Sequence, residues 1–219
     1  MTEAMRLPGA KLRRRRLEHW KLLLFWPVYG LAFYTLEWVL PQDYYQPMYH
    51  PLDERIPFNE WFVIPYVFWY IYMVGSVAYT FFRDKAAFRQ MMHFYMIVFG
   101  VSTVVFFLYP TCQNFRPAVF PRDNVLTRTM GLLYSTDTNT NVCPSLHVSG
   151  AIGAALGFVA TKGFSTRGWK IINALIAASI CASTVFVKQH SVIDVFWGLV
   201  LSAAAWRIAF RRQRLNAEF

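Results

Sequence analysis

Six apolar stretches take up most of this 219-residue chain and constrain its fold more than any other feature. They cover residues 22–40, 61–82, 92–109, 145–161, 171–187 and 191–210. A helix needs about 20 residues to cross about 30 Å of hydrocarbon, so the second stretch fits easily and the fourth and fifth are at the short limit. We expect an all-α, polytopic membrane protein whose six transmembrane helices form a single bundle.

The composition supports a membrane protein and argues against a nucleic-acid partner. Hydrophobic residues make up 56% and aromatic residues 18% of the chain, which is unusual for a soluble domain. The net charge of +10 comes from basic residues at the ends of apolar stretches, not from one polar face. We expect one six-span membrane domain at residues 22–210, between basic cytosolic tails at residues 1–21 and 211–219.

The distribution of Lys and Arg predicts the orientation in the membrane. With both termini in the cytosol, 17 of the 22 Lys and Arg residues lie in cytosolic segments. Positive charge accumulates on the cytosolic side of membrane proteins. The long segment 110–144 and the starts of the fourth and sixth stretches then face the extracytoplasmic side, in the cell membrane or in a eukaryotic endomembrane.

Two histidines stand at the starts of apolar stretches on this predicted outer face. His147 follows Ser145 where a helix would begin, and a helix N-terminus offers unpaired N–H groups and a positive dipole end to phosphate. His190 is followed four residues later by Asp194, on the same helical face. The carboxylate can orient the imidazole and leave its other nitrogen free as a nucleophile.

The segment 110–144 is long enough to suggest a functional loop. Arg116, in Asn114-Phe-Arg-Pro117, supplies a guanidinium suited to bidentate phosphate binding. Asp137 and Asn141 are expected to brace the turn before Pro144, as Asx residues commonly do.

Arg-Pro, Pro-Ser-x-His and His-x-x-x-Asp, in this order and each beside an apolar stretch, resemble the type 2 phosphatidic acid phosphatase superfamily. The resemblance extends from Tyr109 to Gly198. It implies a membrane enzyme that acts on lipid phosphates, with its active site at the extracytoplasmic face. The residues that match the family's functional positions are Arg116 and Ser145 as phosphate ligands, His147 as acid and base, His190 as nucleophile and Asp194 as its partner.

The sequence departs from the family's pattern at two cationic positions. The lysine that the family has seven residues before the motif arginine is here Tyr109. The arginine that follows a serine before the last histidine is here Thr184, after Ser183. From its charge and its place beside His190, Lys188 is predicted to replace one of these phosphate ligands.

These residues together predict hydrolysis of a lipid phosphate monoester or diphosphate through a phosphohistidine intermediate. No metal or cofactor is expected, because the chain has no H-E-x-x-H motif and no paired metal-ligand cysteines. The substrate would enter from the bilayer, with its acyl or prenyl chain in lipid. Phosphatidic acid, lysophosphatidic acid, phosphatidylglycerol phosphate and polyprenyl diphosphate are all compatible, and the sequence indicates neither a choice among them nor an oligomeric state.

Two alternatives stay open. One is a lipid phosphotransferase that resembles inositol phosphorylceramide or sphingomyelin synthases and passes the phospho group to an alcohol, because a pocket with fewer cations suits a phosphodiester. The other is a non-catalytic transporter, because Asp194 and Glu37 are acids within apolar stretches. For Glu37, near the outer end of its stretch, a capped or snorkelling carboxylate is the preferred interpretation.

The remaining signals concern packing. Gly150, Gly153 and Gly157 predict close contact between the fourth helix and its neighbours. Cys112 and Cys143 both lie in the predicted outer loop, and whether they pair is left open.

Overall fold

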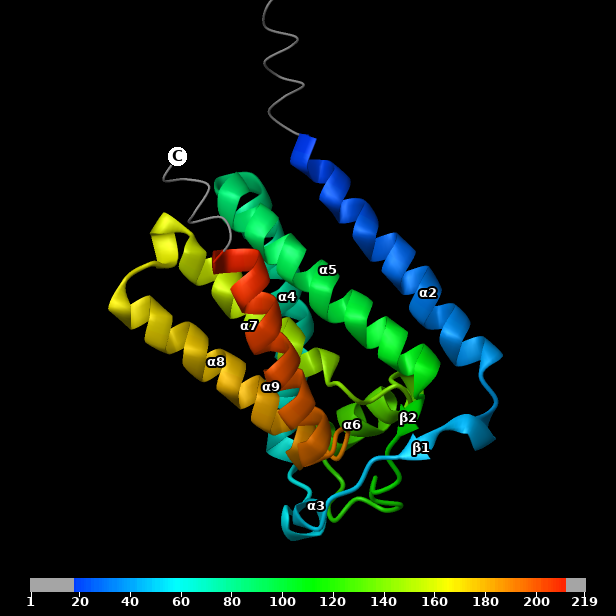
Figure 1. Cartoon of the computed structure of the whole chain (residues 1–219). Helices are drawn as coiled ribbons and strands as arrows, with labels where there is room; N and C mark the ends of the chain where they lie inside the picture. Colours follow the sequence, from blue (N-terminus) through cyan, green and yellow to red (C-terminus); the bar gives the residue numbers. More distant parts are fainter. Residues whose placement is uncertain (1–17, 212–219) are drawn as a thin grey trace, which may run out of the picture.

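The structure is a computed structural model that describes residues 18–211 (Figure 1). The predicted basic tails, residues 1–21 and 211–219, fall almost entirely outside this range. The long helices are α2 (Phe25–Val39), α4 (Val63–Arg83), α5 (Lys85–Leu108), α7 (Leu146–Ala160), α8 (Arg167–Phe186) and α9 (Val192–Trp206). The 3-10 helix η1 (Glu18–Leu24) precedes α2, and the π-helix η5 (Arg207–Arg211) continues α9.

Within the described residues, five helical segments are long and apolar enough to cross a membrane. They are His19–Val39, Glu60–Arg83, Lys85–Leu108, Arg167–Phe186 and Val192–Phe210. The fourth apolar stretch forms α7, which has only 15 residues. The prediction of an all-α fold is confirmed, and the five apolar helices support a membrane protein, whereas a sixth crossing stays a prediction.

Helix α7 lies in the middle of the bundle and packs against α4, α5, α8 and α9. A Cβ atom on Gly153 would lie 2.4 Å from a ring carbon of Tyr95, and one on Gly157 would lie 2.2 Å from Sδ of Met91. The predicted close helix contact is therefore present. Because its neighbours cover α7 on several sides, its length is less constrained by the thickness of the hydrocarbon than that of a helix in contact with lipid.

The corner between α4 and α5 is tighter than the sequence predicted. Helix α5 begins at Lys85, seven residues before the apolar stretch at 92–109. Asp84 ends α4 and caps α5, since its Oδ1 accepts hydrogen bonds from the N–H groups of Ala86 (3.1 Å) and Ala87 (3.0 Å). Hydropathy cannot detect this polar first turn, because an N-cap rather than apolar burial stabilises it.

Short elements form a layer at one end of the bundle, which we call the site end. They are η2 (Gln42–Tyr44), β1 (Gln46–Pro47), α3 (Leu52–Arg55), η3 (Glu60–Phe62), β2 (Thr111–Cys112) and α6 (Val125–Thr136). Strands β1 and β2 pair in parallel and join the segment after α2 to the segment after α5. The described chain begins and ends at the opposite end of the bundle (Figure 1), as expected for termini on one side of a membrane.

Helix α6 lies within the segment that the sequence analysis treated as a loop. A capping box starts it: the side chain of Asn124 accepts from the N–H of Thr127 at 3.0 Å, and Thr127 Oγ1 accepts from the N–H of Asn124 at 3.0 Å. Arg122, just before it, forms a salt bridge of 2.6 Å with the buried Glu60. A helix of 12 residues with modest hydrophobicity gave no clear signal in the sequence.

Replacing Gly153 with Ala should destabilise the bundle. The added methyl group would overlap the rings of Tyr95 and Phe94, and such overpacking typically costs about 1–3 kcal/mol. We expect a lower melting temperature for the detergent-solubilised protein. Gly100→Ala is the matched control, because nothing lies within 4 Å of its Cβ position. Equal melting temperatures for the two variants would contradict this account of the packing of α7.

Candidate active site

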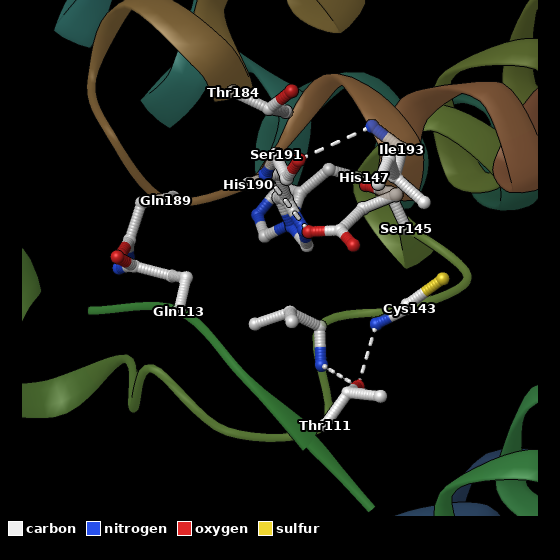
Figure 2. A network of polar contacts seen from close by, with 12 residues as sticks. Thr111, Gln113, Cys143, Ser145, His147, Thr184, Gln189, His190, Ser191 and Ile193 are labelled. Carbon is white, nitrogen blue, oxygen red and sulfur yellow. Dashed lines mark hydrogen bonds and ion pairs between the residues drawn. The ribbon is translucent and has the colours of Figure 1, made fainter. Parts of the chain in front are cut away.

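The two histidines predicted as catalytic meet at the site end of the bundle (Figure 2). His147 lies in the first turn of α7, and His190 lies just before α9. His190 Nε2 is 3.4 Å from His147 Nδ1, and His190 Nδ1 is 3.4 Å from Asp194 Oδ2. The exposed fractions of His147, His190 and Asp194 are 9%, 6% and 0%, so these three polar side chains are largely shielded from solvent.

Asp194 also holds the starts of α7 and α9 together. Its Oδ2 accepts from the N–H of Ser191 at 2.9 Å, which completes a capping box at the start of α9. Its backbone carbonyl accepts from the N–H of Ser145, the N-cap residue of α7, at 3.1 Å. One residue thus orients His190 and fixes where α7 begins.

Asp53 is a buried acid that the sequence analysis did not single out. Its Oδ1 accepts from the N–H of Val192 at 2.9 Å, and its Oδ2 accepts from Ser191 Oγ at 2.6 Å and from the N–H of His50 at 2.8 Å. It therefore anchors the start of α9 to the segment between β1 and α4. No local pattern marks this role, because Ser191 and Val192 lie far away from Asp53 in the sequence.

A second network joins Arg116 to the residue before His190. Arg116 Nη2 donates to Gln189 Oε1 and to the carbonyl oxygen of Asp137 at 2.8 Å, and its Nη1 donates to the carbonyl oxygen of Tyr134 at 3.0 Å. Gln189 Nε2 donates to Asp137 Oδ2 at 3.2 Å. Burial lowers the pKa of Arg116 from its ordinary value.

Aromatic rings fix the orientation of His147. Its ring stacks on Tyr66 with a centroid distance of 4.5 Å, and its centroid lies 4.3 Å from that of Trp69. The hydroxyl of Tyr66 donates to Asp137 Oδ2 at 2.5 Å. Within residues 18–211, Nε2 of His147 is buried without a hydrogen-bond partner, so it can meet a substrate.

The other predicted phosphate ligands are engaged elsewhere. Lys188 Nζ donates to the carbonyl oxygens of Asp53 (2.6 Å) and Ile56, and burial lowers its pKa. Ser145 Oγ accepts from the N–H of Val148 at 3.4 Å as the cap of α7. The structure thus brings together His147, His190 and Asp194 but places the head groups of Lys188 and Arg116 on backbone carbonyls.

A cavity of about 300 Å³ opens beside the histidine pair. Its deeper wall consists of side chains from α2, α4 and α5, namely Trp26, Tyr29, Phe33, Tyr66, Trp69, Tyr70, Met73 and Phe99. Its rim, at the site end, consists of Asp137, Thr138, Thr140, Asn141 and Gln189, and Val142, Leu146, His147 and His190 complete the lining. A polar rim over an aromatic interior suits an amphiphile whose polar group lies at the histidines.

The profile of the PAP2 superfamily matches residues 66–217, a range that contains both histidines and Asp194. The chain belongs to the PAP2 superfamily. This confirms the resemblance seen in the three motifs, and it supports lipid phosphate chemistry of the phosphatase or phosphotransferase type. The PAP2 match begins in α4, so α2, which lines the cavity, lies outside it. The searches of curated proteins and of solved structures gave no significant match.

The turn before the second PAP2 motif is braced differently from the sequence-based expectation. Thr111 Oγ1 accepts from the N–H of Cys143 at 3.0 Å, as Figure 2 shows, and from the N–H of Val142 at 3.1 Å. Its carbonyl accepts from the N–H of Asn141 at 2.6 Å. The side chain of Asn141 makes no hydrogen bond with any described residue. The bracing that we expected from Asn141 therefore comes from Thr111 in β2.

Three further features of this PAP2 chain concern its cysteines, Glu37 and its acidic and histidine side chains. Cys112 and Cys143 are free thiols, and burial, with a further contribution from Asp194, raises the pKa of Cys143 to about 12. Glu37 is capped as preferred, because its Oε1 accepts from the hydroxyls of Thr138 (2.5 Å) and Thr140 (3.0 Å). Among residues 18–211, no three His, Cys, Asp or Glu side chains form a group that could hold a metal ion.

Replacing Asp53 with Ala should lower both stability and activity. It removes the acceptor for Ser191 and Val192, and losing such charge-assisted hydrogen bonds at a helix start costs about 1–3 kcal/mol. Thermal unfolding and lipid phosphate turnover would measure the two effects. The matched control is Asp43→Ala, since Asp43 is an exposed acid in η2, shortly before β1. If both variants keep wild-type stability, Asp53 does not anchor α9.

Proposed function

We propose that this PAP2 protein is a lipid phosphate phosphatase that transfers the phosphoryl group first to His190 and then to water. The observation that carries the proposal is the chain from Asp194 through His190 to His147, with two separations of 3.4 Å. An imidazole held at Nδ1 by a carboxylate presents Nε2 as a nucleophile, and a second imidazole stands beside it as acid and base.

In the first step, Nε2 of neutral His190 attacks phosphorus and forms a P–N bond. The P–O bond to the lipid breaks, and the leaving oxygen keeps the electron pair and takes a proton from protonated His147. The carboxylate of Asp194, next to Nδ1, stabilises the positive charge that develops on His190.

In the second step, His147 acts as a base. It takes a proton from water, the water oxygen attacks phosphorus, and the P–N bond to His190 breaks to release phosphate. No step of the proposal requires a metal ion, and activity is expected to persist in EDTA.

The negative charge on the phosphate oxygens must be stabilised by hydrogen-bond donors. The backbone N–H groups at the start of α7, after Ser145, point out of the helix end, and the helix dipole favours negative charge there. Direct phosphate contact by Arg116, Ser145 and Lys188 stays a prediction of the sequence. We assign Arg116 a positioning role as well, because it holds Gln189 beside His190.

We further propose six membrane crossings, in which α7 crosses in addition to the five long apolar segments. The site would then lie at the extracytoplasmic face. The distribution of Lys and Arg supports this orientation. The cavity beside α2 and α4 supports entry of the lipid from the bilayer, with its chain against the aromatic interior and its phosphate at the histidines.

A second candidate function is phosphotransfer to an alcohol in place of water. It is favoured by the lining of the cavity, which among the described residues contains no Lys or Arg. A site with few cations suits a phosphodiester, which carries one negative charge, better than a dianionic phosphomonoester.

Replacing either histidine should abolish turnover, but at different steps. His190→Ala should form no phosphoenzyme. His147→Ala should lower turnover of phosphatidic acid about 10²–10⁴-fold, because general acid–base catalysis typically contributes that much. With an aryl phosphate, whose leaving group needs no proton, His147→Ala should accumulate alkali-stable phosphohistidine, detected with ³²P. The control is His93→Ala, an exposed histidine of α5, which should behave as wild type. A labelled His190→Ala protein would refute the mechanism.

The acceptor can be identified by competition. The purified protein is incubated with phosphatidic acid and increasing glycerol or a long-chain alcohol, and free phosphate and the new phosphate ester are measured together. A hydrolase should release phosphate in proportion to the diacylglycerol formed. A transferase should instead form the ester in proportion to diacylglycerol and release little phosphate.

A further inference from the structure

A second cavity, which we call the distal cavity, opens at the end of the bundle opposite the histidines and has a volume of about 500 Å³. Figure 1 shows the end of α9, the start of α5 and the turn after α7 at this end. At 1.5 Å of rise per residue, α7 is only about 22 Å long, less than the roughly 30 Å of hydrocarbon in a bilayer. Since α7 stops at Ala160, residues from α5, α7, α8 and α9 surround a space that α7 does not fill.

The lining of the distal cavity combines apolar and polar groups. Leu156 and Val159 of α7 and Phe210 of η5 supply hydrocarbon contacts, while Gln90 of α5 and Lys170, near the start of α8, supply polar groups. Among residues 18–211, no Asp or Glu lines this cavity, and the exposed ammonium of Lys170 forms no salt bridge. The lining therefore suits a molecule that carries a negative charge next to a hydrocarbon chain.

The surface around the distal cavity is strongly basic. In the turn between α4 and α5, the carboxylate of Asp84 is engaged as the cap of α5. None of the exposed cations at this end pairs with an acid in the part of the chain that the structure describes. They include Arg83, Lys85, Arg89, Lys162, Arg167 and Arg207. Such uncompensated charge attracts anions toward the cavity.

The choice of ligand follows from combining the lining with the charge. A soluble anion such as inorganic phosphate would satisfy Lys170 but leave the apolar lining without a partner, and a hydrocarbon chain alone would do the reverse. An anionic phospholipid satisfies both. In the proposed orientation this end faces the cytosol, and the cytosolic leaflet carries anionic lipids that bind basic pockets between transmembrane helices. Orientation by positive charge needs only a basic surface, so it does not account for the cavity.

We infer that the distal cavity binds an anionic phospholipid of the cytosolic leaflet, with its phosphate at Lys170 and part of an acyl chain against Leu156, Val159 and Phe210. The histidines lie at the other end of the bundle, so this lipid is a bound ligand and not a substrate. It would fill the space beyond the end of α7 and join α8 to α5 and α9. The inference goes beyond the proposed lipid phosphate chemistry and does not depend on it.

The test measures retention of phosphatidylglycerol and of phosphatidylcholine with identical acyl chains. Each lipid is titrated onto the purified full chain in dodecyl maltoside, and native mass spectrometry counts the intact lipids that stay bound. We expect the wild type to retain phosphatidylglycerol in preference to phosphatidylcholine. Lys170→Ala should weaken the binding of phosphatidylglycerol about fivefold, as expected when one basic contact to an anionic lipid is lost, and Lys170→Arg should retain it.

The matched control is Lys85→Ala. Lys85 is also an exposed lysine near the start of a helix at this end, but it does not line the distal cavity. Its replacement should leave the retention of phosphatidylglycerol unchanged. An equal loss in Lys85→Ala and Lys170→Ala would show a general attraction to the basic surface and overturn the site.

A second variant fills the distal cavity without a change in charge. Ala160 is an exposed residue at the end of α7 and lines the cavity, so Ala160→Phe would place a ring in the space that the lipid needs. It should weaken the binding of phosphatidylglycerol at least about fivefold, the fold-change expected for Lys170→Ala, and keep the melting temperature in lipid-free detergent. The control is Ala203→Phe, an exposed alanine of α9 that does not line the cavity.

The outcomes separate this inference from the proposed phosphatase. Equal retention of both lipids by the wild type would overturn the preference for an anion. Wild-type retention of phosphatidylglycerol by a folded Ala160→Phe protein would overturn the cavity as its seat. Lipid bound beside the histidines would be retained by Lys170→Ala, so loss of binding in this variant, with phosphatidic acid turnover unchanged, would support a separate site whatever the histidine variants show.

Discussion

The carboxylate of Asp194 is the interaction on which the rest of the site depends. It pairs with Nδ1 of His190, caps α9 through Ser191, and its own backbone accepts from the first residue of the α7 cap, Ser145. A fully buried acid in a membrane bundle is costly unless it has several partners. The same atom, Oδ2, pairs with His190 and caps α9, so the bonds that stabilise the buried acid also hold the site in shape.

Around this centre, the site end is a polar layer on an apolar bundle. Asp53 anchors the start of α9, Glu60 pairs with Arg122, and Lys188 donates to two carbonyls of the segment between β1 and α4. Each contact joins segments that are far apart in sequence. Since buried polar groups are costly without partners, these pairs fix the loops relative to one another and position the residues beside His190.

The two departures from the family's cationic pattern have different structural settings. Thr184 is fully buried, and its carbonyl accepts from the N–H groups of Gln189 and His190, each at 3.0 Å, so this position supports the backbone before α9. Tyr109 is 55% exposed at the end of α5. Together with the engagement of Arg116 and Lys188, these settings leave the cavity with little positive charge.

The sequence by itself determined the class of fold and the family, because apolar stretches and motif spacing are local and linear properties. A PAP2 membrane bundle, the pairing of His190 with Asp194 at one helical turn, and the glycine contacts of α7 were all predictable in this way. Only the tertiary structure decided that α7 lies in the middle of the bundle, that Asp53 and Thr111 brace the site, and that Asn141 is left without partners beside a cavity of little positive charge. Those features depend on contacts between segments distant in the chain, and neither hydropathy nor spacing records where a side chain finds its partner.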